Sequence, residues 1–215
     1  MILGWIASLM VADMLLEGGY QAWAASSGVA VSACVRPITT VAVAGVTRTD
    51  ATVASPGGPD GSLAHYDKRH LFRMAGEHNH YTPGERQVQF ELKGWRIRPL
   101  ICYDLRFPVW SRNRGDYDVL LYVANWPARR REHWRTLLVA RAIENQCYVV
   151  APAQGGYHVN GRETHGHSMI VDPWGRVMDH LPRGSGVVIA DVNPSYQASL
   201  RASLPALLHR TLTQI

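Results

Sequence analysis

Cysteine is scarce in this chain of 215 residues, and its three cysteines cannot all pair with one another. Cys34, Cys102 and Cys147 lie far apart, and their spacing matches no zinc-binding pattern. The sequence therefore predicts neither a disulfide framework nor a zinc site. Free thiols suit a reducing compartment, where a thiolate can act as a nucleophile, so we expect a cytoplasmic protein.

Charged residues are also few, at 18% of the chain against 47% hydrophobic residues. This balance is typical of a globular protein and excludes a disordered or fibrous chain. The net charge is +5, but apart from residues 129–131 the arginines are spread along the sequence, and no basic stripe with interleaved aromatic residues occurs. We therefore expect no nucleic-acid partner, since a basic surface or an anionic small substrate explains the charge equally well.

No uninterrupted hydrophobic run is long enough to span a membrane. Residues 1–16 are the most apolar stretch, but Asp13 interrupts them and they fall short of the roughly 20 residues that a membrane-spanning helix needs. They also lack the basic start of a signal peptide, so a cleaved signal is the less favoured interpretation. The spacing of apolar residues instead predicts a helix over residues 1–28. Because the apolar run is too short to span a bilayer, we expect no membrane partner.

Alternating strand and helix patterns predict a layered α/β protein, and the length suits a single domain with a sizeable core or at most two small domains. The predicted helices cover residues 109–114, 132–145 and 195–208 in addition to residues 1–28. The predicted strands cover residues 29–35, 40–46, 62–67, 88–92, 95–102, 119–124, 148–153, 168–172, 177–179 and 187–192, with a hairpin turn at residues 55–61 and another at residues 93–94.

The segment from Arg96 to Pro108 carries the most informative local pattern. A short apolar run delivers Cys102 to a polar turn, and Pro108 then allows a new element to begin. A thiol at the end of a buried strand is held rigidly yet can face a cleft, and the backbone N–H groups that follow can donate to an oxyanion. The local pattern alone still favours the alternative that Cys102 is a small buried hydrophobic residue.

Ten histidines raise the question of a metal site, because five of them fall in predicted loops. No His-x-x-x-His pair on a helix and no Cys/His ligand set accompanies them, so ordinary hydrogen bonds are the favoured interpretation and we expect no metal. The five are His78, His80, His158, His165 and His167.

Three further motifs flank the cysteine segment: Tyr66-Asp-Lys-Arg-His-Leu-Phe72, Glu77-His-Asn-His-Tyr-Thr-Pro-Gly84 and Tyr122-Val-Ala-Asn-Trp-Pro127. Together they resemble the nitrilase superfamily of carbon–nitrogen hydrolases, whose active site is a Glu-Lys-Cys triad on an αββα sandwich. The resemblance implies this α/β fold in one domain over residues 1–215. Residues 1–55 are atypical of the family, residues 60–194 resemble it, and residues 195–215 form a helical tail similar to a dimer-contacting arm.

The resemblance also assigns roles to the reacting groups. It implies that Cys102 is the nucleophile, that Lys68 supplies the positive charge at the oxyanion, and that Glu77 positions the lysine and the substrate. Lys68 lies in a full match to the family motif Lys-x-His-Leu-Phe. Without that match, a solvated lysine and an exposed loop carboxylate would be the expected interpretations.

Other residues would bind the substrate or support the site. The resemblance gives the oxyanion hole the backbone N–H of Tyr103, and it places Asn125 and Trp126 in the pocket wall at the carboxyl end of a strand. Asp104 and Arg106 would make either a structural contact or a contact to a substrate carboxylate. The remaining polar residues read as supports: His70 and Phe72 for the loop, and a buried network of Arg141, Glu144 and Asn145 for the helix.

One part of the family pattern is missing. The family's general base is a glutamate in a Pro-Glu context well before the lysine, whereas Glu17 is the only glutamate before Glu77 and its surroundings do not fit. Family sequences also begin with a strand and helix that this chain lacks. We favour the interpretation that the chain is amino-terminally incomplete over the alternative that Glu17 has been recruited. Loss of the base would reduce the rate by several orders of magnitude.

These observations lead to one main hypothesis and two alternatives. Residues 66–126 are similar to bacterial omega-amidases, whereas residues 151–158, 164–168 and 172–175 look more like deaminated glutathione amidases. Both imply a cofactor-free homodimeric amidase that uses water to hydrolyse the terminal amide of a dicarboxylate monoamide through a cysteine thioester. The alternatives are a catalytically impaired protein that binds a ligand or partner, and, less favoured because no resolving cysteine lies nearby, a redox-sensing thiol protein.

Overall fold

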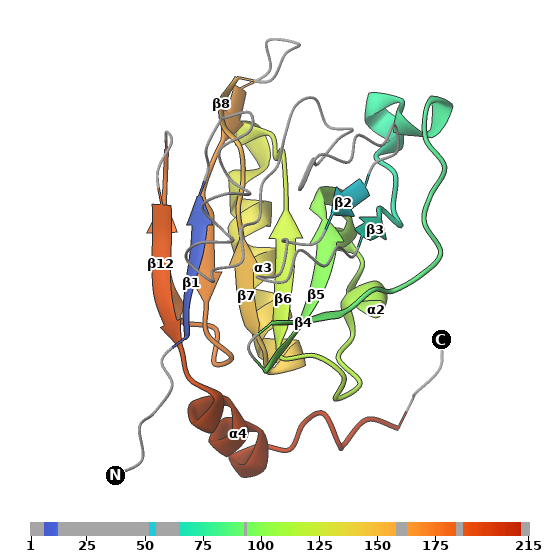
Figure 1. The fold of residues 1–215 in the computed structure, drawn as a ribbon. Helices are drawn as coiled ribbons and strands as arrows, with labels where there is room; N and C mark the ends of the chain where they lie inside the picture. The colour runs from blue at the N-terminus through green and yellow to red at the C-terminus, as the bar shows by residue number, and fades with distance from the viewer. Residues whose placement is uncertain are drawn as a thin grey trace.

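A six-stranded mixed sheet organises the computed structural model, which describes residues 7–12, 52–54, 65–92, 94–157, 163–183 and 187–211. The strand order is β11-β10-β7-β6-β5-β4, and β5, β6 and β7 are parallel neighbours (Figure 1). The six strands are β4 (Phe90–Leu92), β5 (Trp95–Ile101), β6 (Val119–Val123), β7 (Tyr148–Ala151), β10 (Ser168–Val171) and β11 (Val177–Leu181).

Three two-stranded pairs accompany the large sheet: β1 (Ala7–Ala12) with β12 (Val187–Val192), β2 (Thr52–Ala54) with β3 (His65–Asp67), and β8 (Gly155–Tyr157) with β9 (Glu163–His165). The α-helices are α2 (Pro108–Ser111), α3 (Arg131–Asn145) and α4 (Pro194–Ser203). Short 3-10 helices are η1 (Arg73–Ala75), η2 (Glu77–Asn79), η3 (Cys102–Arg106) and η4 (Ala128–Arg130). None of the helices described has the length and apolarity needed to cross a bilayer.

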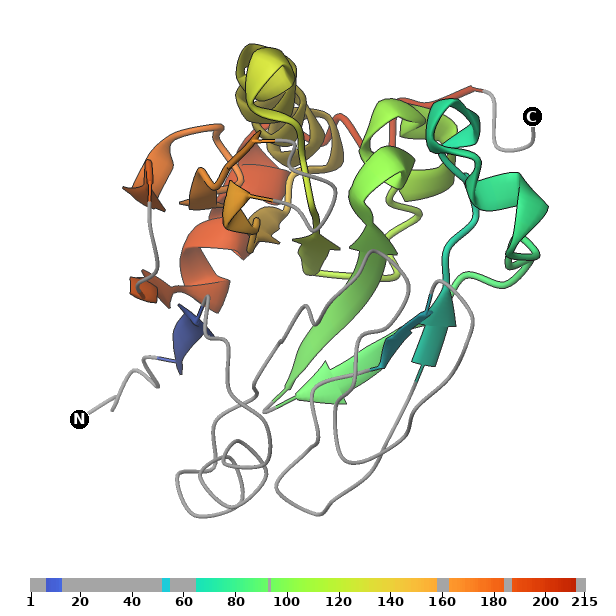
Figure 2. The same ribbon diagram turned by 90° about the horizontal axis from the view of Figure 1, so that it is seen from above.

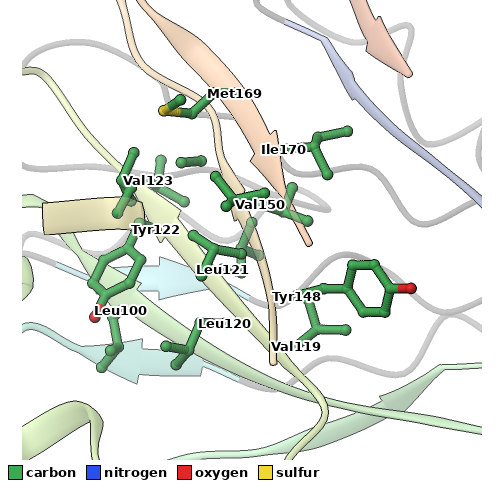
Figure 3. Close-up of a cluster of buried hydrophobic side chains, with 14 of the residues drawn as sticks. Leu100, Val119, Leu120, Leu121, Tyr122, Val123, Tyr148, Val150, Met169 and Ile170 are labelled. Carbon is green, nitrogen blue, oxygen red and sulfur yellow. The ribbon is translucent and has the colours of Figure 1, made fainter. Parts of the chain in front are cut away.

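The large sheet is covered on both faces. In Figure 2, α3 and the β1–β12 pair lie on opposite sides of it. Every residue of β6, β7 and β10 is buried, as expected for strands that pack on both faces. Their side chains form the apolar core shown in Figure 3, in which Leu100, Leu120 and Ile170 have no exposed surface.

Helix α3 follows from the spacing of its buried residues. Trp134, Leu138 and Ala142 recur every four positions, so one stripe of the helix faces the sheet. The helix ends at Asn145, where Gln146 adopts a left-handed conformation and closes the last turn. The connection from β6 through α3 to β7 is thus a parallel crossover. Because β5 and β6 are also parallel, the residues after β5 and those after β6 lie at the same edge of the sheet.

Most of the predicted elements occur, with shifted ends. The β4–β5 hairpin, β6, α3, β7, β10, β11 and β12 match their predicted positions. Strands β2 and β3 pair antiparallel, as a hairpin requires, while the turn predicted at residues 55–61 lies outside the described residues. The short helix predicted at residues 109–114 lies at Pro108–Ser111, and the tail helix ends at Ser203 instead of residue 208. Pro205 cannot continue a helix, which accounts for the earlier end.

The helix predicted for residues 1–28 is wrong where the structure describes it. Ala7–Ala12 is a strand that pairs antiparallel with β12 along its whole length, from Ala7 opposite Val192 to Ala12 opposite Val187. A short apolar run fits either structure by periodicity, and here the partner strand decides the outcome. The strands predicted at residues 29–35 and 40–46 lie outside the described residues.

Gly175 fixes the turn between β10 and β11. Its φ is +91°, and a Cβ atom there would lie 2.6 Å from Cγ1 and 2.7 Å from Cδ1 of Ile143 on α3. We expect Gly175→Ala to lower the free energy of unfolding by about 1–2 kcal/mol, because it adds backbone strain and crowds the helix. Urea unfolding would measure this. Gly115→Ala is the control, since its φ is +83° but nothing lies within 4 Å of the new Cβ. Equal losses in the two variants would contradict the contribution from crowding.

Candidate active site

Cys102 begins the turn that follows β5, as the sequence predicts. Its φ is +43°, an uncommon value for a non-glycine residue, so the chain turns sharply at the thiol. The side chain is half-buried, and its Sγ lies 3.8 Å from the backbone carbonyl oxygen of Asn125, which follows β6. The thiol therefore lies between the carboxyl ends of two parallel strands, where ligands commonly bind in α/β sheets.

Lys68 and Glu77 form a buried ion pair. The Lys68 ammonium donates to both carboxylate oxygens of Glu77, at 2.9 and 2.7 Å, and the two residues are 1% and 5% exposed. The backbone N–H of Phe72 donates a further hydrogen bond of 2.7 Å to the same carboxylate. A lysine is rarely so deeply buried without such a partner, so neither residue is the solvated side chain that its type alone would predict.

The ion pair and the thiol share one electrostatic environment. Burial raises the pKa of Cys102, the Lys68 ammonium lowers it, and the Glu77 carboxylate raises it. Because burial is the largest of these causes, the protonated thiol is favoured in the structure as it stands. A nucleophile in this state needs a base to remove its proton.

Asp104 connects the lysine loop to the cysteine turn. This carboxylate is fully buried and accepts hydrogen bonds from Tyr66 Oη (2.8 Å), the His70 backbone N–H (2.9 Å) and the Ile101 backbone N–H (3.1 Å). The His70 ring also lies 2.8 Å from it through Nδ1, and stacks on Phe107 with a centroid separation of 3.8 Å. Of the two contacts that the sequence left open for Asp104, the structure shows the structural one.

Tyr66 completes this connection. Its hydroxyl donates to Asp104 and accepts from Trp110 Nε1 at 2.8 Å and from the Arg69 backbone N–H at 3.2 Å. Burial and the Asp104 charge raise the pKa of Tyr66, so the hydroxyl stays protonated and keeps its role as donor. Lys68 belongs to the chain after β3, and Cys102 to the chain after β5. This network therefore links the chain after β3 to the turn after β5 at the site.

The predicted pocket residues lie after β5 and after β6, the two strands whose ends flank the thiol. Trp126 is buried and donates from Nε1 to the carbonyl oxygen of Arg130 at 2.8 Å, and the Arg106 guanidinium lies over its ring at 5.3 Å. Arg106 Nη2 is 2.9 Å from Nδ1 of His133. Tyr103 is half-buried, with its ring 5.0 Å from that of Phe72. The structure thus brings the predicted residues Tyr103, Arg106, Asn125 and Trp126 to the same end of the sheet as the thiol.

The polar network predicted for α3 is present. The buried Arg141 donates to the Leu105 carbonyl oxygen at 2.6 Å and to Glu144 at 3.0 Å, and Asn145 accepts from the Asn113 backbone N–H at 2.7 Å. Glu144 itself is exposed, so the network is buried only at its arginine and asparagine. These contacts hold α3 against the turn that carries the nucleophile.

The structure bears only in part on two questions that the sequence raised, a general base at Glu17 and the loop histidines as metal ligands. Glu17 lies outside the described residues, and so does His158 among the loop histidines. In the part of the chain that the structure covers, no three histidine, cysteine or acidic residues gather as a metal site would require. Of the carboxylates described, Glu77 and Asp104 raise the pKa of Cys102, and both are engaged in the hydrogen bonds given above.

Sequence reasoning missed the place of Arg130. Its guanidinium lies 5.3 Å over the Phe72 ring, which in turn lies 5.0 Å from the ring of Tyr103, the residue after Cys102. The run Arg129-Arg-Arg131 stood out only as a break in an even distribution of charge. Its position directly after a strand-end motif was the signal that could have placed it at the site.

The fold and the site together define a layered α/β protein with a strand-end thiol beside a buried lysine–carboxylate pair. The chain belongs to the carbon–nitrogen hydrolase family, whose model matches residues 19–202. The solved structure of XC1258 from Xanthomonas campestris, a CN-hydrolase superfamily protein with an arsenic adduct in its active site, is 37% identical. It superposes with a TM-score of 0.80 over 95% of this chain and 78% of that chain, and such neighbours confirm the predicted nitrilase-like fold.

Two curated relatives agree with the sequence's mixed resemblance. Omega-amidase YafV of Yersinia enterocolitica is 51% identical over 149 residues, which are 69% of this chain and 58% of that protein. The deaminated glutathione amidase of a Synechocystis strain is 39% identical over 192 residues, which are 81% of this chain and 68% of that protein. The chain thus spans a little over half the length of the omega-amidase relatives that it matches.

The pKa shift of Cys102 leads to a labelling prediction. Because burial raises this pKa, the reactive thiolate is scarce at neutral pH and grows as the pH rises through the raised value. We therefore expect the alkylation rate of Cys102 by iodoacetamide to reach its half-maximum above the ordinary thiol pKa of about 8.5. Mass spectrometry of the tryptic peptide would follow the rate, with a short cysteine peptide as reference. A midpoint at or below that of the reference would contradict the prediction.

Proposed function

We propose that this chain carries the catalytic centre of an amidase that hydrolyses the terminal amide of small dicarboxylate monoamides through a cysteine thioester. The observation that carries the proposal is the buried Lys68–Glu77 pair acting on the half-buried thiol of Cys102. Family membership and the two curated relatives, named as amidases of this kind, support the reaction class.

The proposed reaction proceeds through attack by the thiol, loss of ammonia and hydrolysis of the thioester. The Cys102 sulfur attacks the amide carbon, and the Lys68 ammonium stabilises the oxyanion together with the Tyr103 backbone N–H. The C–N bond then breaks, and the nitrogen leaves as ammonia after taking up a proton. Water hydrolyses the thioester, which gives the carboxylic acid and restores the thiol. Glu77 holds the lysine, and Arg106, Asn125 and Trp126 surround the substrate.

The proton transfers need a base, and the engaged carboxylates of Glu77 and Asp104 are poorly suited to it. We assign this role to a carboxylate outside the described part of the chain. The free thiols suit a cytoplasmic setting, and we propose a homodimer that requires neither nucleic acid nor membrane.

The test is release of ammonia from glutaramate and from 2-oxoglutaramate by the purified chain. We expect ammonia and the corresponding dicarboxylate in equal amounts. Covalent trapping of the acyl group on Cys102, seen as a mass increase of its peptide, would support the thioester. Release of ammonia without any dependence on Cys102 would rule the proposal out.

A second candidate is a catalytically impaired member of the family that binds a ligand or a partner. The observation in its favour is that both described carboxylates near the thiol are already engaged. Under this alternative, glutarate would protect Cys102 from alkylation while the chain released no ammonia from either amide.

A further inference from the structure

Two arginines, Arg106 and Arg130, both contact Trp126 in the candidate site. Arg106 lies over the Trp126 ring, and the same indole donates to the backbone carbonyl oxygen of Arg130. Arg130 is half-buried at the end of η4, with its guanidinium over the Phe72 ring. Because Phe72 donates its N–H to Glu77, the second arginine rests on the loop that also holds the lysine–carboxylate pair.

Neither guanidinium contacts a carboxylate among the described residues. The arginine ion pairs there involve other arginines, and besides lying over the Trp126 ring the Arg106 guanidinium contacts the imidazole of His133. Burial lowers the pKa of Arg130, and the charges of Arg129 and Arg106 lower it further. Two partly desolvated cations of like charge repel each other, and an anion between them would relieve both costs.

The position of this pair relative to the thiol identifies the anion. The Arg130 guanidinium lies over the Phe72 ring, which is 5.0 Å from the ring of Tyr103, the residue after Cys102. The segment that leads to Arg130 also contacts the thiol, through the carbonyl oxygen of Asn125. A single small molecule with an amide at the sulfur and an anionic group at its other end would fill both positions. Guanidinium groups favour carboxylates because their planar donors match the two oxygens.

We propose that Arg130 is a specificity-determining residue, which together with Arg106 binds the carboxylate of the substrate and selects amides that carry one over neutral amides. This inference rests on the proposed function, since it assumes that the amide reacts at Cys102. Arg130 supplies charge and hydrogen bonds to the far end of the substrate and takes no part in bond breaking.

The experiment measures occupancy of the site and needs no turnover. Iodoacetamide alkylates Cys102 of the full chain in the presence of increasing glutarate, which has two carboxylates, or pentanamide, which has the same chain length without one. The concentration that halves the alkylation rate is read by mass spectrometry. Arg130→Gln is compared with Arg135→Gln, a control on an exposed position of α3.

We expect Arg130→Gln to raise the half-protecting concentration of glutarate about tenfold or more, as for loss of a charge-assisted hydrogen bond. The value for pentanamide should stay the same, and Arg135→Gln should change neither. Arg130→Lys, which keeps the charge without the planar fork, should fall in between. It also serves as the test variant if the glutamine protein does not fold, as judged by its thermal melt.

Three results would overturn the inference: no protection of the parent by glutarate, unchanged protection in Arg130→Gln, or an equal loss for glutarate and pentanamide. Failure of the proposed function looks different. If Arg130-dependent protection occurs but no amide is hydrolysed, the carboxylate site stands and the amidase does not. If amides are hydrolysed but glutarate protects Cys102 of Arg130→Gln as well as it protects the parent, the proposed amidase activity stands and Arg130 does not select the substrate.

Discussion

Cys102→Ala should lower ammonia release from glutaramate by about a thousandfold or more. The alanine removes the sulfur that would form the thioester, and loss of a nucleophile from a catalytic unit has effects of this size in other hydrolases. The rate of ammonia release at saturating substrate measures the effect. The variant should fold as the parent does, because the side chain is half-buried and only one atom is removed.

Cys147→Ala is the matched control for this variant. Cys147 is fully buried beside the carbonyl oxygen of Arg141, away from the site, and burial holds its thiol protonated. We expect Cys147→Ala to keep parental activity and to lose stability of about 1 kcal/mol through the small cavity that it leaves. Parental activity in Cys102→Ala, or loss of activity in both variants, would remove the basis for a nucleophile at residue 102.

Lys68→Met should both inactivate the protein and destabilise it. Methionine has a similar length but no charge, so oxyanion stabilisation is lost, and a hundredfold to thousandfold loss of rate, roughly, is expected. The Glu77 carboxylate is left buried without its ammonium partner, which lowers the free energy of unfolding by about 3 kcal/mol at neutral pH. Ammonia release and urea unfolding measure the two effects separately.

The double variant Lys68→Met, Glu77→Gln separates structure from chemistry. Removing both charges takes away the unpaired carboxylate, so most of the stability should return while the activity does not. The alkylation midpoint of Cys102 should also shift to higher pH in Lys68→Met, because the ammonium that lowers the thiol pKa is gone. Recovery of activity in the double variant would show that Lys68 is needed for folding alone.

The sequence predicted the fold wherever packing leaves a periodic signature. The continuous apolar run of β6 reflects a strand that is buried on both faces. The four-residue spacing of Trp134, Leu138 and Ala142 reflects a helix, α3, that is buried on one face. Residues 7–12 have no decisive signature, since a short and mostly apolar segment fits a helix or a strand. Their state depends on β12, which lies far away in the chain.

The candidate site could be predicted through resemblance and only partly through local pattern. The strand that ends at Cys102 is visible in the sequence, whereas nothing local distinguishes Lys68 or Glu77 from surface residues. The hydrogen bond between Tyr66 and Asp104 joins residues 38 positions apart. Such long-range polar contacts leave no periodic trace, so no pattern of a single sequence could have revealed the network that ties the two loops together.

Lys68 follows the β2–β3 pair and Cys102 follows β5 of the large sheet, and this has a consequence for heat inactivation. Strand β3 carries Tyr66, which is fully buried in the apolar core, and the Lys68 side chain directly after it is buried as well. Detaching the pair would expose both side chains, so we expect it to open together with the core. Turnover should then fade on warming in parallel with the cooperative transition that circular dichroism follows.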